Sequence, residues 1–425
     1  IYFWVNHFLK NKHIAALSGI LFLVNGRMLI YDSMLGHIDI FYSWLTFNSF
    51  MLIFYFLEQK KWFLLFFSSY LITAITFLSK GMPSIVFQGF TLISVLLYTK
   101  NFKKLLSWQH ILSGIICLLI IGAYFLNYYQ YNPNLEGYLS TIWDQSSRRT
   151  AAEFGFLTSL IHVISFPFEH AMHLFPASLL IVFCFHKEFI KGIRQNSFLT
   201  FVSIVFLANI WVYWLSPQTR PRYLLMLYPL LFIIWSHAYY SYRDILPKTQ
   251  KVCNFILLGL AILVTLAIPS ALFFGLDKYV PHLNIKIIFL TLSCALISLT
   301  IYRLKNTKII AFIALLMMVR LAFSWFILPH RYENMNGNYF KQSAIEIGSI
   351  VKKEPLYFYK YHPSEPEIPF HDRLIFYIQR SRMKQVKFTE SDAKPGYYFT
   401  FDKNPDNPDA ILVKQYQNLK LYRIK

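Results

Sequence analysis

The chain has 425 residues, of which 56% are hydrophobic and only 15% are charged, and this is too apolar for a soluble protein of ordinary composition. Apolar runs of about 18 to 22 residues recur as far as Leu328, each long enough to cross a hydrocarbon core roughly 30 Å thick. The formal net charge is +20. Most of this charge falls in short loops between the runs, where anionic lipid accounts for it, so we predict no nucleic-acid partner. The composition indicates an all-α polytopic membrane protein.

The loops between the apolar runs alternate in charge. The positive-inside rule places the basic loops in the cytoplasm, namely residues 10–12, 58–61, 100–104, 187–194, 242–251 and 302–308. The other loops then lie on the outer face, at 31–39, 79–83, 130–157, 216–223 and 275–282, together with everything after Pro329. This alternation predicts about eleven spans, near 14–31, 40–57, 62–79, 83–99, 109–128, 166–186, 198–215, 223–241, 252–274, 283–301 and 309–328. Residues 157–176 have a second interpretation, as an interfacial helix interrupted by Pro167 and Pro176.

The first outer loop, RMLIYDSMLGHIDIF, carries charged residues at a membrane boundary. Besides Arg27 and His37, it contains two acidic residues, which contribute nothing to anchoring at a membrane surface. Asp32 and Asp39 therefore have two interpretations. Either they cap the helix that follows, or a carboxylate at this boundary holds a catalytic or substrate-binding group.

The second outer turn, SKGMP, joins two spans tightly. Gly81 allows a sharp reversal of the chain, and Pro83 suits the first turn of the next helix. The pattern predicts a helical hairpin with Lys80 at its tip. A lysine here is a compact charge suited to a phosphate, although a lysine that only reaches for the membrane surface is the simpler alternative.

Two further outer segments carry candidate ligands. The long loop at 130–157 contains Arg148 and Arg149, and it is either a lid or an ordinary interfacial helix. The segment LIHVISFPFEHAMHLFP follows it, and Glu169, His170 and His173 are of the residue types that bind divalent metals. Histidines at a helix end without a metal are the commoner case, so a metal site stays open.

The turn SPQTRPRYLLMLYP opens a late span with basic residues on the face opposite the cytoplasmic loops. Arg220 and Arg222 run against the topology rule there, and Tyr223 follows them directly. An anionic ligand is the simplest reason for such an arginine pair.

The composition changes after Pro329. Short alternating segments such as PLYFYKY, RLIFYIQR, GYYFTFDK and AILVKQY are bounded by Pro, Gly, Asn and Asp, which is the pattern of β-strands. The segment YFKQSAIEIGSIVKK has apolar residues at helical spacing. We predict two domains, a multi-span membrane domain over residues 1–329 and a small α/β domain on the outer face over residues 330–425.

The order of these features resembles the GT-C membrane glycosyltransferases. The residues that carry the resemblance are RMLIYDSMLGHID, the hairpin FLSKGMPSIV, the late motif RPRYLLMLYP and the segment FYIQR in the small outer domain. Within this superfamily the chain looks most like the bacterial aminoarabinose transferase and protein mannosyltransferase-like branch. The resemblance extends from about Ala15 to the end of the chain.

The resemblance implies an enzyme of the bacterial inner membrane. It would move a hexose or pentose, with inversion, from a polyprenyl-phosphate carrier to a lipid, glycan or protein acceptor on the outer side. Lys80 matches the Lys-Gly hairpin of the family, and Arg220, Arg222 and Tyr223 match its late basic-aromatic motif, so these four would face the donor phosphate. Asp32 matches an acidic residue after the early helices and would support catalysis. No cofactor is implied, and a divalent metal stays open.

The resemblance also implies a part that precedes Ile1. The principal catalytic carboxylate of the family lies in a large first outer loop that has no counterpart among these residues, and the chain opens without methionine as IYFWVNHFLK. We therefore expect one more span and this loop upstream, giving about thirteen spans in the complete chain.

Two other classes of protein are compatible with the spans. A transporter or flippase of lipid-linked sugars would explain the charges at the membrane boundary, but not the small folded outer domain or the Lys-Gly hairpin. A non-catalytic membrane scaffold is favoured only if the upstream loop lacks an acid.

Overall fold

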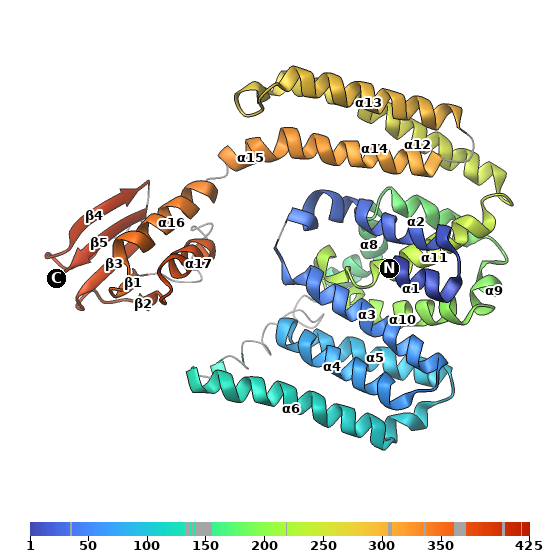
Figure 1. Cartoon of the computed structure of the whole chain (residues 1–425), viewed down its shortest axis with the longest axis horizontal. Helices are drawn as coiled ribbons and strands as arrows, with labels where there is room; N and C mark the ends of the chain where they lie inside the picture. Colours follow the sequence, from blue (N-terminus) through green and yellow to red (C-terminus); the bar gives the residue numbers. More distant parts are fainter. Residues whose placement is uncertain are drawn as a thin grey trace. The chain divides into compact units, whose positions relative to one another are not determined.

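The computed structural model describes residues 1–34, 36–131, 136–137, 140, 155–217, 219–304, 308–334, 337–360, 371–401, 404–417 and 419–425. Its contacts divide the chain into two compact units; the helices and strands of both are labelled in Figure 1. The first comprises Ile1–Thr265 and Ser293–Arg320, and the second comprises Leu266–Leu292 and Leu321–Lys425.

Helices make up nearly all of the described residues before Gly337. They are α1 (Tyr2–Leu9), α2 (Lys12–Val24), the π-helix η1 (Arg27–Tyr31), the 3₁₀ helix η2 (Asp32–Met34), α3 (Ile38–Glu58), α4 (Trp62–Lys80), α5 (Pro83–Tyr98), η3 (Phe102–Leu106), α6 (Trp108–Tyr131), α8 (Phe156–His173), η5 (Ala177–Phe185), α9 (Phe189–Arg194), α10 (Ser197–Trp214), η6 (Pro221–Leu224), α11 (Tyr228–Tyr242), α12 (Pro247–Ala267), η7 (Ile268–Phe274), η8 (Leu276–Lys278), α13 (Leu283–Arg303), α14 (Lys308–Ala322), the π-helix η9 (Phe323–Ile327) and α15 (Leu328–Asn334).

The described residues contain seven helices that are long and apolar enough to cross a membrane, or up to nine if each of two bent pairs is one span. Nine of the eleven predicted spans overlap these helices and bent pairs. The other two predicted spans correspond to α5 and α11, which have only 16 and 15 residues. Helices of this length fall below the roughly 20 residues of an untilted span. The multi-span character is therefore confirmed, whereas the count of eleven stays a prediction.

The predicted span at 166–186 is not one straight helix. α8 and η5 meet at an angle of 119°, and the break falls just before Pro176, which precedes η5. α8 exposes an apolar stripe at helical spacing, formed by Leu157, Ile161, Ile164, Phe168 and Met172. Its other side carries histidines and a glutamate, so α8 is amphipathic, and together with η5 it is long and apolar enough to form one broken span. Pro167 lies inside α8 without interrupting it.

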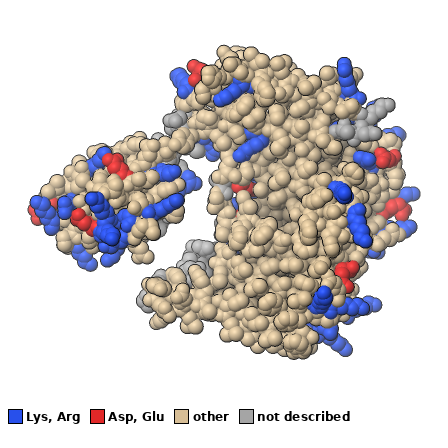
Figure 2. Space-filling view, in the orientation of Figure 1, with Lys and Arg blue, Asp and Glu red and all other residues tan. Residues whose placement is uncertain are grey.

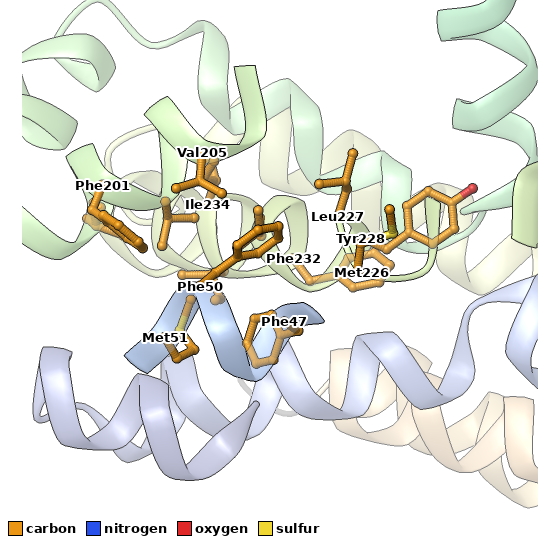
Figure 3. Close-up of a cluster of buried hydrophobic side chains, with 14 of the residues drawn as sticks. Phe47, Phe50, Met51, Phe201, Val205, Met226, Leu227, Tyr228, Phe232 and Ile234 are labelled. Atoms are coloured by element: carbon orange, nitrogen blue, oxygen red, sulfur yellow. The ribbon is translucent and has the colours of Figure 1, made fainter. Parts of the chain in front are cut away.

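The largest core cluster of the first unit joins α3 to α10 and α11. Phe47, Phe50 and Met51 of α3 face Phe201 and Val205 of α10 and Phe232 and Ile234 of α11 (Figure 3). All of these side chains are buried. Helices in a membrane associate through such close packing, because lipid tails are as apolar as the side chains. The cluster fixes the middle of α3 relative to α10 and α11, and both α3 and the segment η6–α11 carry candidate site residues.

The chain ends in a small α/β domain. Its strands are β1 (Leu356–Tyr359), β2 (Lys387–Thr389), β3 (Gly396–Phe401), β4 (Ile411–Tyr416) and β5 (Leu419–Ile424), in the order β2-β1-β3-β5-β4. β1 pairs in parallel with β2 and β3, whereas β5 pairs antiparallel with β3 and β4. α16 (Gly337–Val351) and α17 (His371–Arg382) share a buried apolar cluster with the sheet. Charged side chains are dense on this domain and sparse over the long helices (Figure 2).

The segment RLIFYIQR is a helix, and its prediction as a strand is wrong. It forms most of α17, the crossover between the parallel strands β1 and β2. Leu374, Ile378 and Arg382 are buried, and their spacing of four residues is that of one helix face. The segments PLYFYKY, GYYFTFDK and AILVKQY contain strands β1, β3 and β4, and YFKQSAIEIGSIVKK forms α16, as predicted.

Candidate functional site at the ends of α3, α4 and η6

The candidate site is organised around the carboxylate of Asp39. This residue lies in the first turn of α3 and is only 5% exposed. An acidic side chain is favoured there because the N-terminus of a helix carries a partial positive charge. The carboxylate is nevertheless taken up by two side chains from distant segments, so capping does not account for its position.

Lys80 contributes the first cation. It is the last residue of α4, and its Nζ forms an ion pair with Oδ1 of Asp39. Gly81 follows with φ 78° and ψ −143°, a backbone conformation that favours glycine, and Pro83 opens α5. The predicted hairpin is thus present, and its geometry sends the lysine back over the start of α3.

Arg222 contributes the second cation. It lies in η6, and its Nε is 3.4 Å from Oδ2 of Asp39. Its Nη1 is 3.0 Å from Nε2 of His37, the residue that precedes α3. The hydroxyl of Tyr228 donates to the carbonyl oxygen of Pro221 at 3.0 Å, which holds η6 in place from the next helix.

Two tyrosine rings enclose the lysine. The Nζ of Lys80 lies 4.8 Å from the ring centre of Tyr42 and 4.5 Å from that of Tyr223. Cation–π contacts of this kind stabilise a charge that has lost part of its water. The guanidinium of Arg222 also lies over Tyr223, at 5.6 Å. With two cations on one carboxylate, the three ionic groups carry a net charge of about +1, which suits an anionic ligand.

Asp32 lies in a second, separate ion pair. It is 2% exposed and accepts two hydrogen bonds from Arg27, at 2.7 Å and 3.2 Å. The adjoining segment Arg27–Tyr31 is a π-helix, and Arg320 of α14 donates to the carbonyl oxygen of Leu29 at 2.5 Å. The structure therefore pairs Asp32 with Arg27 and not with Lys80 or Arg222.

The three metal candidates do not form a ligand set. His173 Nε2 lies 3.4 Å from the Glu169 carboxylate, while Nδ1 of His170 is 2.8 Å from the carbonyl oxygen of Phe166. In the part of the chain that the structure describes, no group of three His, Cys, Asp or Glu residues is placed to hold a metal ion. Nothing in this geometry supports a metal there.

Of the three remaining predicted site residues, the structure describes one. Arg220 is exposed, immediately before η6, and Arg148 and Arg149 lie outside the described residues. Sequence reasoning left Asp39 open between a helix cap and a functional carboxylate, and it did not single out His37 or Tyr42 as site residues. The only signal for Asp39 was an acid on the outer side of the predicted membrane, which a capping role explained equally well.

Comparison with known proteins supports the fold. No family model matches the sequence, and no curated protein is similar to it. Two solved structures of ArnT from Cupriavidus metallidurans are similar, one bound to undecaprenyl phosphate with a TM-score of 0.59 and one in the apo state with a TM-score of 0.58. Each match has 14% sequence identity and covers 99% of this chain and 80% of that chain. The predicted resemblance to the aminoarabinose transferase branch is thus confirmed in the fold.

Proposed function

We propose that this protein is a membrane glycosyltransferase that takes a sugar from a polyprenyl-phosphate carrier and passes it to a lipid, glycan or protein acceptor. One observation carries the proposal. Lys80 and Arg222, from segments far apart in the sequence, converge on one buried carboxylate in a fold that, in ArnT, is seen with undecaprenyl phosphate. A pair of fixed cations is what a phosphate leaving group requires.

The proposed reaction is a single displacement at the anomeric carbon. The bond from this carbon to the phosphate oxygen breaks, and its electron pair stays on the phosphate. The acceptor oxygen or nitrogen forms the new bond and loses its proton to a base, so the configuration inverts. Lys80 and Arg222 stabilise the charge that develops on the phosphate, and Asp39 keeps the two cations together before the carrier binds.

We place the protein in the bacterial inner membrane, with this site and the domain from about residue 330 onward on the outer face. The support is that residues 31–39, 79–83 and 216–223, which the charge pattern assigns to one face, do meet in one site.

Carrier binding is the direct test. The purified protein in lipid nanodiscs is titrated with undecaprenyl phosphate, and Lys80→Ala and Arg222→Ala are compared with the exposed control Lys278→Ala. Each site variant is expected to weaken binding by about 1.5 to 3 kcal/mol, the value of a hydrogen bond to a charged group. Unchanged affinity in both site variants contradicts the proposal.

Transfer is the second readout. With a radiolabelled polyprenyl-phosphate sugar and a membrane extract as acceptor source, label is expected to leave the carrier. A protein that moves the intact labelled carrier across proteoliposomes without releasing sugar would instead be a flippase.

A further inference from the structure

The contact between His37 and Arg222 defines the protonation state of the histidine. An arginine guanidinium has only N–H donors and no acceptor. Nε2 of His37, 3.0 Å from Nη1 of Arg222, must therefore accept the hydrogen bond with its lone pair. The imidazole is consequently neutral in this arrangement, with its proton on Nδ1.

This hydrogen bond matters because it is shorter than the contact between Arg222 and Asp39. The Nε of Arg222 approaches Asp39 only to 3.4 Å, and this buried nitrogen makes no hydrogen bond within the described residues. The guanidinium keeps 21% of its side-chain surface exposed, which leaves room for a ligand. His37 and Asp39 thus hold Arg222 from two positions at the start of α3.

Protonation of His37 would remove this support. A protonated imidazole has no acceptor, and it would place a second positive charge beside the guanidinium. The charged groups of the site are Arg222, Lys80 and Asp39. Lys80 and Arg222 both contact the Asp39 carboxylate.

We propose that His37 is a positioning residue that holds Arg222 ready for the carrier phosphate only while its imidazole is neutral. Resting on the proposed function, this makes use of the carrier-linked sugar sensitive to acid.

The test is the pH profile of kcat/KM for the carrier-linked sugar. The donor must be the phosphodiester, because a phosphomonoester has its own second ionisation near pH 6. Wild type is compared with His37→Ala, with His37→Gln, whose amide oxygen accepts a hydrogen bond without titrating, and with the exposed control His13→Gln at the start of α2. Profiles run from pH 5.5 to pH 8.

Wild type and His13→Gln are expected to lose kcat/KM as the pH falls, mainly through a rise in KM. His37→Ala is expected to lose about tenfold or more at pH 8, on the scale of a hydrogen bond to a charged group. His37→Gln should rescue most of that loss and flatten the acid side of the profile.

An acid limb in His37→Gln that matches wild type would overturn the role of His37. This failure is distinct from failure of the proposed function, which would appear as unchanged carrier binding in Lys80→Ala and Arg222→Ala. Failure of His37→Gln to rescue His37→Ala at pH 8 would also count against the proposal, because it would indicate a requirement for the ring itself.

Discussion

Asp39 and Arg222 meet where α3 begins and η6 turns, with Oδ2 of the carboxylate 3.4 Å from Nε of the guanidinium. The other oxygen of the same carboxylate binds Lys80. The two cations therefore hold an internal anion before any ligand arrives. A phosphate that enters must share them with Asp39, so the position of this carboxylate decides how much positive charge the ligand meets.

Asp39→Asn should destabilise the protein and impair carrier binding together. Removing one partner of a buried ion pair costs about 3 to 5 kcal/mol, and less is expected here because the Lys80 and Arg222 side chains stay 13% and 21% exposed. The asparagine no longer keeps Lys80 and Arg222 together, and because the two cations repel each other they are expected to move apart and bind the phosphate less well. Thermal unfolding in detergent measures the first effect, and titration with undecaprenyl phosphate measures the second. Asp277→Asn, at an exposed position, serves as the control, and equal melting temperatures for the two variants would refute the prediction.

Gly81→Ala should distort the hairpin that positions Lys80. With φ 78° and ψ −143°, this residue occupies a region nearly restricted to glycine, where another residue costs about 1 to 3 kcal/mol. Carrier affinity should fall as well, because Lys80 precedes the strained residue. Gly89→Ala is the matched control, since a Cβ there would meet nothing within 4 Å. A loss of stability and affinity no larger than that of Gly89→Ala would show that the turn tolerates a side chain.

Local pattern explains which parts of this structure could be predicted. Hydropathy located the helices, because each long apolar run has to satisfy its own backbone hydrogen bonds in a membrane. The hairpin at Lys80 followed from Gly81 and Pro83, which act within the turn itself. The strand predicted for RLIFYIQR was wrong because an apolar run of this length fits a strand or a buried helix face equally well. The partners of Asp39 could not be predicted, because Lys80 is brought to it by packing of α4 on α3, and Arg222 by packing of η6 and α11 against the same bundle.

Gly348→Ala should destabilise the C-terminal domain. A Cβ at this position of α16 would lie 1.7 Å from Oγ and 2.8 Å from Cβ of Ser381 in α17. The hydroxyl can rotate away, but the Ser381 Cβ can move only with its helix, so overpacking of about 1 to 3 kcal/mol is expected. Limited proteolysis of the domain during urea unfolding measures the loss. The neighbouring exposed change Ser349→Ala should have little effect, and adding Ser381→Gly should restore part of the stability. A Gly348→Ala protein as resistant as Ser349→Ala would show that the helices separate easily.

The side of the membrane on which the C-terminal domain lies can be measured with single cysteines. Gln385→Cys in this domain and Gln59→Cys between α3 and α4 are both exposed positions. The four native cysteines are buried or half-buried, so background labelling should be low. In intact spheroplasts a membrane-impermeant maleimide is expected to label Gln385→Cys, and to label Gln59→Cys only after lysis. The reverse result would invert the proposed orientation.

The shared carboxylate also restricts how many times the chain can cross the membrane between Lys80 and Arg222. Lys80 and Arg222 can reach one Asp39 only if the chain crosses the bilayer an even number of times between them. α5, α6 and α10 supply three crossings if each passes through once. Among the described residues, the pair α8 and η5, bent by 119°, is the one further candidate for the fourth crossing, which requires it to be a broken span and not a re-entrant loop. On that count of crossings the basic loop at 187–194 would lie on the face opposite the site, as the positive-inside rule predicts.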